Sequence, residues 1–305
     1  MGAGVRVVAV VGPTAAGKSA LSIALAHALD GEVVNADSMQ LYRGMDIGTA
    51  KLTPVEREGV PHHLLDIWPV TEPASVAEYQ RLARAAVDDI LARGRVPLLV
   101  GGSGLYVRAV LERFEFPGTD PELRGRLERE LAALGPAPLY ERLRAVDPAA
   151  AAGILPGNGR RIVRALEVVE LTGAPFAASL PEPTPFYPSV QLGVDLDTAL
   201  LDERIARRVD RMWADGLVAE TRELVGHGLP EGRTASRALG YQQVLRFLAG
   251  ESTEAEAHDE TIRATRRFVR RQRSWFRRDP RVHWLDAAAP DLVEVALRVV
   301  RDAGE

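Results

Sequence analysis

A glycine-rich segment near the N-terminus constrains the fold more than any other feature of this 305-residue chain. Residues 5–11 are mostly valine, as in a buried strand, and residues 19–29 carry leucine and alanine at helical spacing. The segment between them fits the pattern G-x-x-x-x-G-K-[ST]. A strand, this loop and a helix in that order predict a phosphate-binding loop, or P-loop. It consists of Gly12, Pro13, Thr14, Ala15, Ala16, Gly17, Lys18 and Ser19.

The residue types of this loop suit an anionic ligand. Its glycines let backbone amides converge on an anion, and the N-terminus of the following helix adds positive potential. Lys18 supplies a point charge, and the Ser19 hydroxyl can ligate Mg²⁺. The loop therefore predicts a site for a di- or triphosphate without saying which one.

Strand and helix patterns alternate over the first 110 residues. After the P-loop helix we expect a strand at residues 32–36, a helix at 75–93 and a buried strand at 96–100. This alternation predicts an α/β fold: a P-loop NTPase-like core with a parallel β-sheet flanked by helices.

The pattern changes after residue 114. Residues 120–171 are helical in pattern, with breaks at positions 135–136, 147–148 and 156–157. Five prolines between positions 175 and 188 indicate a linker, residues 190–196 resemble a returning strand, and helices are expected from there to the end. We therefore predict a core of residues 1–114 and 189–305, with an all-helical insertion domain at 115–188.

Composition excludes several classes of protein. The chain has no cysteine, which rules out disulfides, thiol catalysis and cysteine-ligated metals. No apolar run approaches the roughly 20 residues that cross a bilayer, and no signal peptide is readable, so we expect a cytoplasmic protein without a membrane partner. The net charge of −4 argues against general nucleic-acid binding, yet nine arginines lie between positions 263 and 281. That run is either a solvated helix face or a local site for a polyanion.

An aspartate follows the second expected strand. Asp37 would lie at the carboxyl edge of the sheet beside the P-loop, where open α/β sheets bind ligands. Two interpretations remain open: Asp37 is a general base or part of a metal shell, or Asp37 or Ser38 is the N-cap of a helix. The strand at 96–100 ends in Gly-Gly-Ser-Gly and offers no acid.

Taken together, these motifs resemble one family, the bacterial tRNA dimethylallyltransferases, also called tRNA isopentenyltransferases. The similar blocks follow the family's order over nearly the whole chain, and the block at residues 37–51 is the most specific. They lie at residues 11–19, 37–51, 61–66, 97–106, 161–167, 237–242 and 265–277. The resemblance implies transfer of a dimethylallyl group from dimethylallyl diphosphate to the exocyclic amine of the adenosine 3′-adjacent to the anticodon in tRNA. Diphosphate leaves and Mg²⁺ assists.

The resemblance also implies roles for residues. Asp37 is the expected general base, Arg237 closes on the diphosphate, and Ser103 lines the substrate channel where the family often has threonine. The P-loop would hold the prenyl diphosphate, with Ser19 on Mg²⁺. The expected tRNA-binding residues are Asp37, Ser38, Met39, Gln40, Ser103, Arg160, Arg161, Arg164, Gly240, Tyr241 and Gln242.

Some questions stay open at the level of sequence. Asp46, Lys51, His62 and His63 are either functional or structural, and the adjacent histidines lack the spacing of a zinc site. We expect a monomer. The alternative functions are an adenylate isopentenyltransferase acting on free AMP, a P-loop small-molecule kinase, and a tRNA-binding module without activity. The insertion and the arginine run count against the first of these, and the block at 37–51 counts against the kinase.

Overall fold

A parallel sheet forms the centre of the computed structural model, which describes residues 7–176 and 182–304. The strand order is β3-β2-β4-β1-β5-β6, and every neighbouring pair is parallel. The strands are β1 (Val7–Val11), β2 (Gly31–Asn35), β3 (His62–His63), β4 (Val96–Gly101), β5 (Ser189–Asp195) and β6 (Val282–Asp286). The predicted α/β class with a parallel sheet is confirmed. Residues 5 and 6 of the first expected strand lie outside the described residues.

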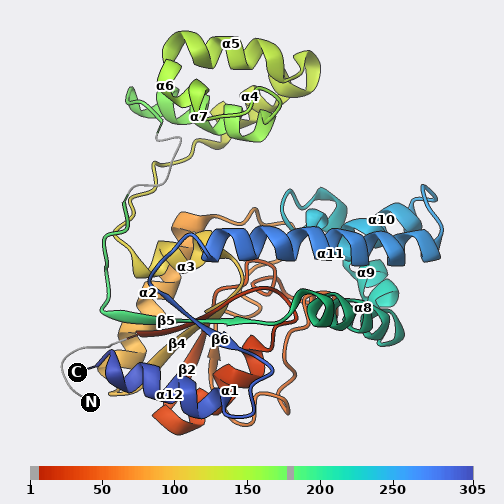
Figure 1. Cartoon of the computed structure of the whole chain (residues 1–305). Helices are drawn as coiled ribbons and strands as arrows, with labels where there is room; N and C mark the ends of the chain where they lie inside the picture. The colour runs from red at the N-terminus through yellow and green to blue at the C-terminus, as the bar shows by residue number, and fades with distance from the viewer. Residues whose placement is uncertain (1–6, 177–181, 305) are drawn as a thin grey trace. The chain divides into compact units, whose positions relative to one another are not determined.

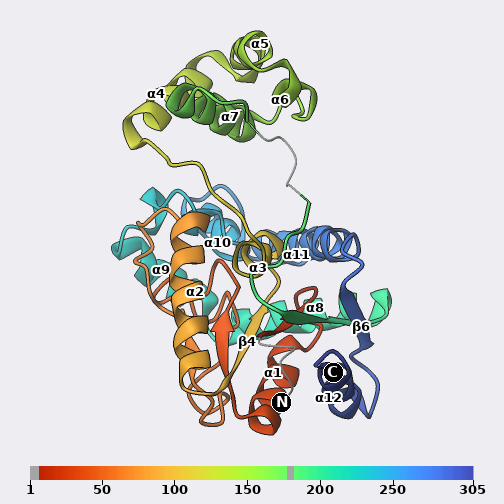
Figure 2. The same ribbon diagram turned by 90° about the vertical axis from the view of Figure 1, so that its left-hand side faces the viewer.

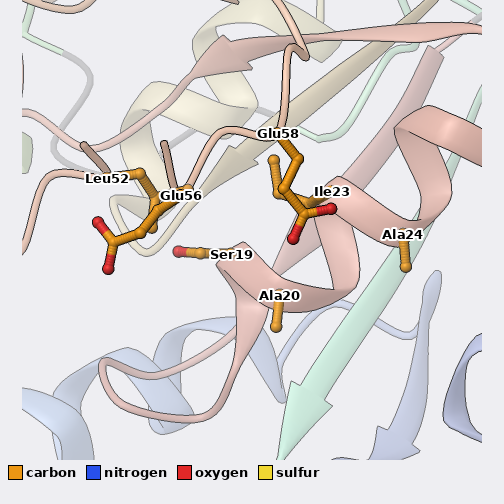
Figure 3. A pocket seen from close by; sticks show the side chains of 7 residues that line it. All are labelled: Ser19, Ala20, Ile23, Ala24, Leu52, Glu56 and Glu58. Carbon is orange, nitrogen blue, oxygen red and sulfur yellow. The ribbon is translucent and has the colours of Figure 1, made fainter. Parts of the chain in front are cut away.

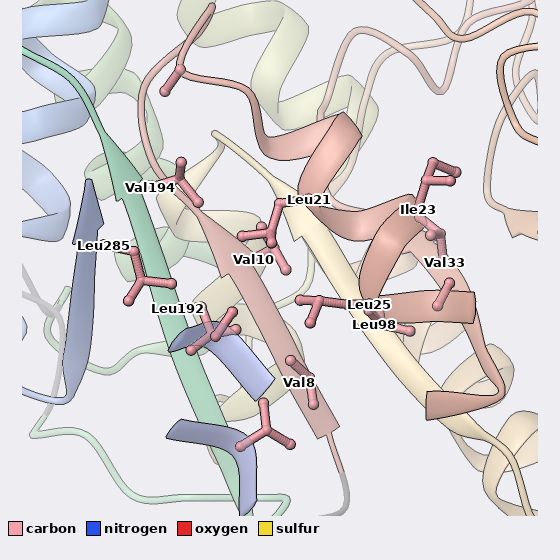
Figure 4. Close-up of a cluster of buried hydrophobic side chains, with 14 of the residues drawn as sticks. Val8, Val10, Leu21, Ile23, Leu25, Val33, Leu98, Leu192, Val194 and Leu285 are labelled. Atoms are coloured by element: carbon pink, nitrogen blue, oxygen red, sulfur yellow. The ribbon is translucent and has the colours of Figure 1, made fainter. Parts of the chain in front are cut away.

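Helices cover both faces of this sheet, which is why its central strands are apolar on both sides (Figures 1 and 2). On one face, α1 (Lys18–Leu29) and α12 (Leu292–Asp302) pack on Val8, Val10 and Leu98 (Figure 4). On the other face, α2 (Val76–Ala92) and α3 (Gly104–Leu111) pack on the alternate side chains of the strands. Alternate side chains of β1 point to opposite faces of the sheet, so this one strand contributes to the apolar core on each face.

The C-terminal helices form a third layer of packing. They are α8 (Thr198–Ala214), α9 (Leu217–Gly226), α10 (Tyr241–Leu248) and α11 (Glu254–Phe276), with 3₁₀ turns at Leu229–Glu231 and Ala235–Arg237. A third apolar cluster joins α8, α9 and α10 to Tyr42 and Met45, both fully buried. This cluster fixes the long loop between β2 and β3 against the C-terminal helices.

The chain divides into two compact units. The second, Arg113–Thr184, contains α4 (Pro121–Leu134), α5 (Pro136–Val146), α6 (Pro148–Ala152) and α7 (Gly159–Thr172) around a core of its own that includes Leu127, Leu143 and Ile162. The sequence placed the boundaries at 115 and 188. Residues after 184 belong with the core unit because Phe186 donates to the Leu111 carbonyl and Tyr187 to the Asp88 carboxylate. Residues 177–181 of the expected linker lie outside the described part.

Two strands were missed by the sequence reading. β6 interrupts the expected run of helices, and His62–His63 form the short edge strand β3, where no strand was expected. Both lie at the edges of the sheet and are short, so neither shows the long apolar run of a central strand. Within residues 7–176 and 182–304, every helix is too short or too polar to cross a bilayer.

Candidate active site

The P-loop connects β1 to α1 at the carboxyl edge of the sheet. Gly12 has φ +135°, and a Cβ there would lie 2.2 Å from the Val194 carbonyl oxygen, so only glycine fits. Ala15 and Gly17 also have positive φ, which curls the loop over the start of the helix. Among the described residues no side chain caps α1, so its first amide groups are free to bind an anion.

Two cations and one carboxylate lie close enough to one another beside this loop for their charges to interact. Lys18 Nζ donates to the Pro13 carbonyl at 2.8 Å. Burial lowers the pKa of Lys18 to about 8; the Asp37 carboxylate opposes that shift and the Arg208 guanidinium adds to it. Burial also lowers the pKa of Arg208, again opposed by Asp37. The structure therefore brings Lys18 and Asp37 together, as the sequence predicted, and adds Arg208.

Arg208 is the functional candidate that sequence reasoning missed. Its Nη2 donates to the Thr49 carbonyl at 3.2 Å, while its Nε is buried with no hydrogen-bond partner among the described residues. An arginine with an unused buried donor next to a P-loop lysine is suited to an anion. One signal could have found it, because Arg204, Arg207, Arg208 and Arg211 recur at the i, i+3, i+4 and i+7 positions of one helix face.

Asp37 projects from the loop after β2 and does not cap a helix. No helix begins between residues 37 and 75, so the capping interpretation is excluded for Asp37 and Ser38. Instead Asp37 Oδ1 accepts a bond from the Met39 amide at 2.9 Å, and the Asn35 side chain holds the Asp37 backbone at both its N–H and its C=O. Its Oδ2 has no hydrogen-bond partner among the described residues. One carboxylate oxygen is thus fixed and the other is open to a ligand.

Ser103 lies next to the Asp37 loop. It precedes α3 but makes no capping bond, because its Oγ accepts from the Ser38 amide at 3.3 Å and lies 3.4 Å from Ser38 Oγ. Met39 packs partly buried in the third apolar cluster. Gln40 donates its amide to the Thr49 carbonyl at 3.1 Å and so braces the loop. The predicted residues 37–40 and 103 are therefore contiguous.

The polar residues left open by the sequence make structural contacts. Lys51 is buried and donates to Asp46 Oδ1 and Asp66 Oδ1, each at 2.5 Å. His63 pairs with Glu32 at 2.6 Å on the sheet edge, and His62 Nδ1 lies 2.9 Å from the Val60 carbonyl. Among the described residues, no group of three or more His, Cys, Asp or Glu side chains has the geometry of a metal site.

The segment around Arg237, which belongs to the C-terminal helices, packs against the loop between β2 and β3. Arg237 is exposed and makes no ion pair within the described residues, while Ala235 and Ala238 beside it are buried in one cluster with Met45. Tyr241 is fully buried, and its hydroxyl donates to Glu220 at 2.5 Å. Gly240 starts α10 with φ +86°, and Gln242 is exposed. Of these residues, Arg237 and Gln242 present polar side chains to solvent.

The remaining candidates lie in the second compact unit. Arg160 and Arg161 are exposed in the first turn of α7. Arg164 is engaged, because it donates to the carbonyls of Pro117 and Gly118 and pairs with Glu167 at 2.7 Å. Arg164 therefore stabilises the start of this unit, and Arg160 and Arg161 are the exposed charges of the segment.

The arginine run at residues 263–281, in α11 and the segment after it, is largely an ion-pair network. Arg270, Arg271 and Arg278 are exposed and make no ion pair among the described residues; Arg271 lies 5.8 Å from the Phe268 ring. The other arginines pair with acids: Arg263 and Arg267 with Glu260, Arg266 with Asp202, Arg273 and Arg277 with Asp195, and Arg281 with Asp279 and Glu112. Most of the run is therefore structural.

Two adjoining pockets open at the P-loop. One, of about 330 Å³, is lined by Ser19, Leu52, Glu56, Glu58 and apolar residues of α1, and Figure 3 shows the Ser19 hydroxyl extending toward the side of Glu56. The other, of about 580 Å³, runs from Ala15 and Ser19 along α8 and includes Arg208. The Ser19 hydroxyl fits Mg²⁺, which keeps water ligands and is bound by one or two protein oxygens together with substrate phosphates.

The fold and this site define a P-loop α/β protein with a phosphate-binding edge and a carboxylate beside it. A profile of the family described as "IPP transferase" matches residues 40–279. The chain belongs to this family.

Relatives of known name and structure agree with this assignment. A protein of Salinispora arenicola named tRNA dimethylallyltransferase is 86% identical, over 97% of this chain and 87% of its own length. One of the same name from Streptomyces avermitilis is 71% identical, over 95% and 93%. The tRNA isopentenylpyrophosphate transferase of Bacillus halodurans aligns with a TM-score of 0.74 and 41% identity, over 98% of this chain and 96% of that one. A eukaryotic dimethylallyltransferase acting on tRNA aligns with a TM-score of 0.82 and 26% identity, over 97% and 78%.

Proposed function

We propose that the chain transfers a dimethylallyl group from dimethylallyl diphosphate to the exocyclic amine of the adenosine 3′-adjacent to the anticodon in tRNA. The family and the named relatives support the reaction class. The single observation that carries the assignment of residues is that Arg208, whose buried Nε has no hydrogen-bond partner among the described residues, lines one pocket with the P-loop residues Ala15 and Ser19. The charge of Asp37 acts on both Lys18 and Arg208. A cationic cradle and an open carboxylate side by side are what this transfer requires.

The cationic side of the site would bind the leaving diphosphate. Backbone amides at the start of α1, together with Lys18 and Arg208, are positioned to stabilise negative charge as the C–O bond to diphosphate breaks. Arg237, which is exposed and makes no ion pair within the described residues, would approach from the facing segment. Mg²⁺ would be held by the Ser19 hydroxyl and by diphosphate oxygens, and would neutralise part of that charge.

The carboxylate side would serve the acceptor. The amine of adenine is a weak nucleophile because its lone pair is delocalised into the ring. As the new N–C bond forms, the amine loses a proton, and Asp37 Oδ2 is the open acceptor for it. The Met39 amide holds the other oxygen, so the carboxylate is oriented before substrate binds.

The RNA side of the site is proposed from the surrounding residues. The adenosine must leave the anticodon stack to reach Asp37, and Ser38, Met39, Gln40 and Ser103 would border the extruded base. Exposed arginines of α11 and the exposed Arg160 and Arg161 would contact phosphates. We further propose that the protein acts in the cytoplasm as a monomer.

A transfer assay tests this function. Purified protein, Mg²⁺ and labelled dimethylallyl diphosphate are mixed with an anticodon stem-loop RNA carrying adenosine next to the anticodon. The matched control RNA carries inosine there, which has an oxygen in place of the 6-amine of adenine and no other exocyclic amine. We expect label in the first RNA only. Label in free AMP and not in RNA would indicate an adenylate isopentenyltransferase, and ATP consumption without prenyl transfer would indicate a kinase.

A further inference from the structure

Gln272 joins two loops of the site from a helix that lies outside both. It belongs to α11 and is buried, with 5% of the residue exposed. Its Oε1 accepts a hydrogen bond from the Thr14 amide of the P-loop at 2.9 Å, and its Nε2 donates to the Gly102 carbonyl after β4 at 3.0 Å. One neutral side chain therefore satisfies a donor in the first loop and an acceptor in the second.

The approach of α11 to these loops depends on glycine. A Cβ on Gly102 would lie 2.2 Å from Gln272 Nε2, and a Cβ on Gly104 would lie 2.0 Å from Trp275 Nε1. Figures 1 and 2 show α11 passing beside α3, the helix that begins at Gly104. The segment after β4 therefore packs directly against the side chains of α11.

The two hydrogen bonds reach both halves of the proposed site. Thr14 is a member of the loop that would hold the diphosphate, and its amide is already committed to Gln272. Gly102 precedes Ser103, whose Oγ accepts from the Ser38 amide next to Asp37. Gln272 thus stands between the leaving-group side and the base side.

We infer that Gln272 is a positioning residue that fixes the distance between the diphosphate cradle and the Asp37–Ser103 side. This inference rests on the proposed function, since it concerns the geometry of that transfer. The amide is the side chain that can accept from Thr14 and donate to Gly102 without charge. A glutamate would keep the first bond, lose the second and place a negative charge near the diphosphate.

Two substitutions at this position test the inference. We expect Gln272→Glu and Gln272→Leu to lower kcat for transfer by about 10- to 100-fold, because small displacements of reacting groups reduce rate steeply. KM for the stem-loop RNA should stay within about twofold, since Gln272 is buried and does not touch it. The control on the same helix is Thr261→Val, which removes a buried hydroxyl bond to Ala257 and should keep the wild-type kcat.

A second route displaces the amide without removing it. The Cβ introduced by Gly102→Ala would crowd Gln272 Nε2, so this variant should also lose kcat. In the double variant with Gln272→Ala the crowding is relieved, and the losses should be clearly less than multiplicative. Multiplicative losses would overturn the inference.

Folded fraction and thermal melts are measured for every variant, so that rates refer to folded enzyme. A wild-type kcat per folded molecule in both Gln272 variants would overturn the positioning role. So would a loss of kcat in Thr261→Val equal to that in Gln272→Leu, since it would reflect the helix as a whole. Absence of transfer by the wild-type protein would instead reject the proposed function itself.

Discussion

Removal of one carboxylate of α9 should loosen the loop that follows Asp37. Glu220 accepts the backbone amides of Asp46, Ile47 and Gly48 at 3.2, 2.8 and 3.3 Å, and the Tyr241 hydroxyl at 2.5 Å. These amides lie outside the helices and strands, so the Glu220 carboxylate is their principal hydrogen-bond acceptor. Glu220→Gln keeps the shape of the side chain and replaces one acceptor oxygen with a donor.

The loss can be worked from these four contacts. A hydrogen bond to a charged group contributes about 1.5–3 kcal/mol. The substitution replaces one carboxylate oxygen with an NH₂ group, which then faces either the Ile47 amide or the Tyr241 hydroxyl. We therefore expect a loss of about 2–3 kcal/mol in the free energy of unfolding. At about 2–4 °C per kcal/mol for a unit of this size, the melting temperature should fall by about 4–12 °C.

The assay is thermal unfolding of wild type, Glu220→Gln, Tyr241→Phe and the double variant. Tyr241→Phe removes only the 2.5 Å bond and leaves the carboxylate to three amides, so it should cost less than Glu220→Gln. The double variant should lose less than the sum, because the two side chains contact each other and their effects are coupled. A melting temperature for Glu220→Gln within about 1 °C of wild type would refute this reasoning.

Three further outcomes follow from the structure. Gly12→Ala should prevent stable folding, because the new Cβ would lie 2.2 Å from the Val194 carbonyl; Gly59→Ala, also at positive φ but in open space, should cost about 1 kcal/mol in a urea titration. The pKa of Lys18, lowered to about 8 by burial, implies that kcat/KM for dimethylallyl diphosphate falls as pH rises past 8, which a pH–rate profile measures. Arg93, with His63 and Arg95, lowers the pKa of Glu32 to about 2, below its value of 4.5 in the unfolded chain. The Glu32 carboxylate therefore stabilises the fold above pH 4.5, and this stabilisation is lost as pH falls toward 2. The melting temperatures of wild type and Glu32→Gln should differ at neutral pH and become equal in acid.

The fold was readable where periodicity is strong. Val7–Val11 and Val96–Gly101 carry the uninterrupted apolar runs of strands buried on both faces, and the helical unit has its breaks at the glycines and prolines that end helices. β3 and β6 were not readable, because an edge strand of two to five residues borrows its stability from the neighbour it pairs with. Local sequence carries little of that information.

The site was readable where a motif fixes the backbone and not where tertiary packing brings helices together. The P-loop and Asp37 follow strands directly, so their places at the sheet edge could be predicted. Arg208 and Gln272 reach the P-loop from α8 and α11, far along the chain, and nothing in their own segments shows where those helices pack. For the arginine run, the sequence left open a solvated helix face or a polyanion site, and only the fold shows that most of these arginines pair with acids such as Glu260 and Asp195.

The central claim is that Asp37 takes the proton of the acceptor amine beside a cationic diphosphate cradle. Asp37→Asn tests it most directly, because an asparagine oxygen can still accept from the Met39 amide and the loop should keep its shape. The measurement is the single-turnover rate of prenyl transfer to the stem-loop RNA at saturating dimethylallyl diphosphate. We expect this rate to fall by about 10²- to 10⁴-fold with diphosphate binding unchanged. A rate equal to that of the wild-type protein would contradict the account.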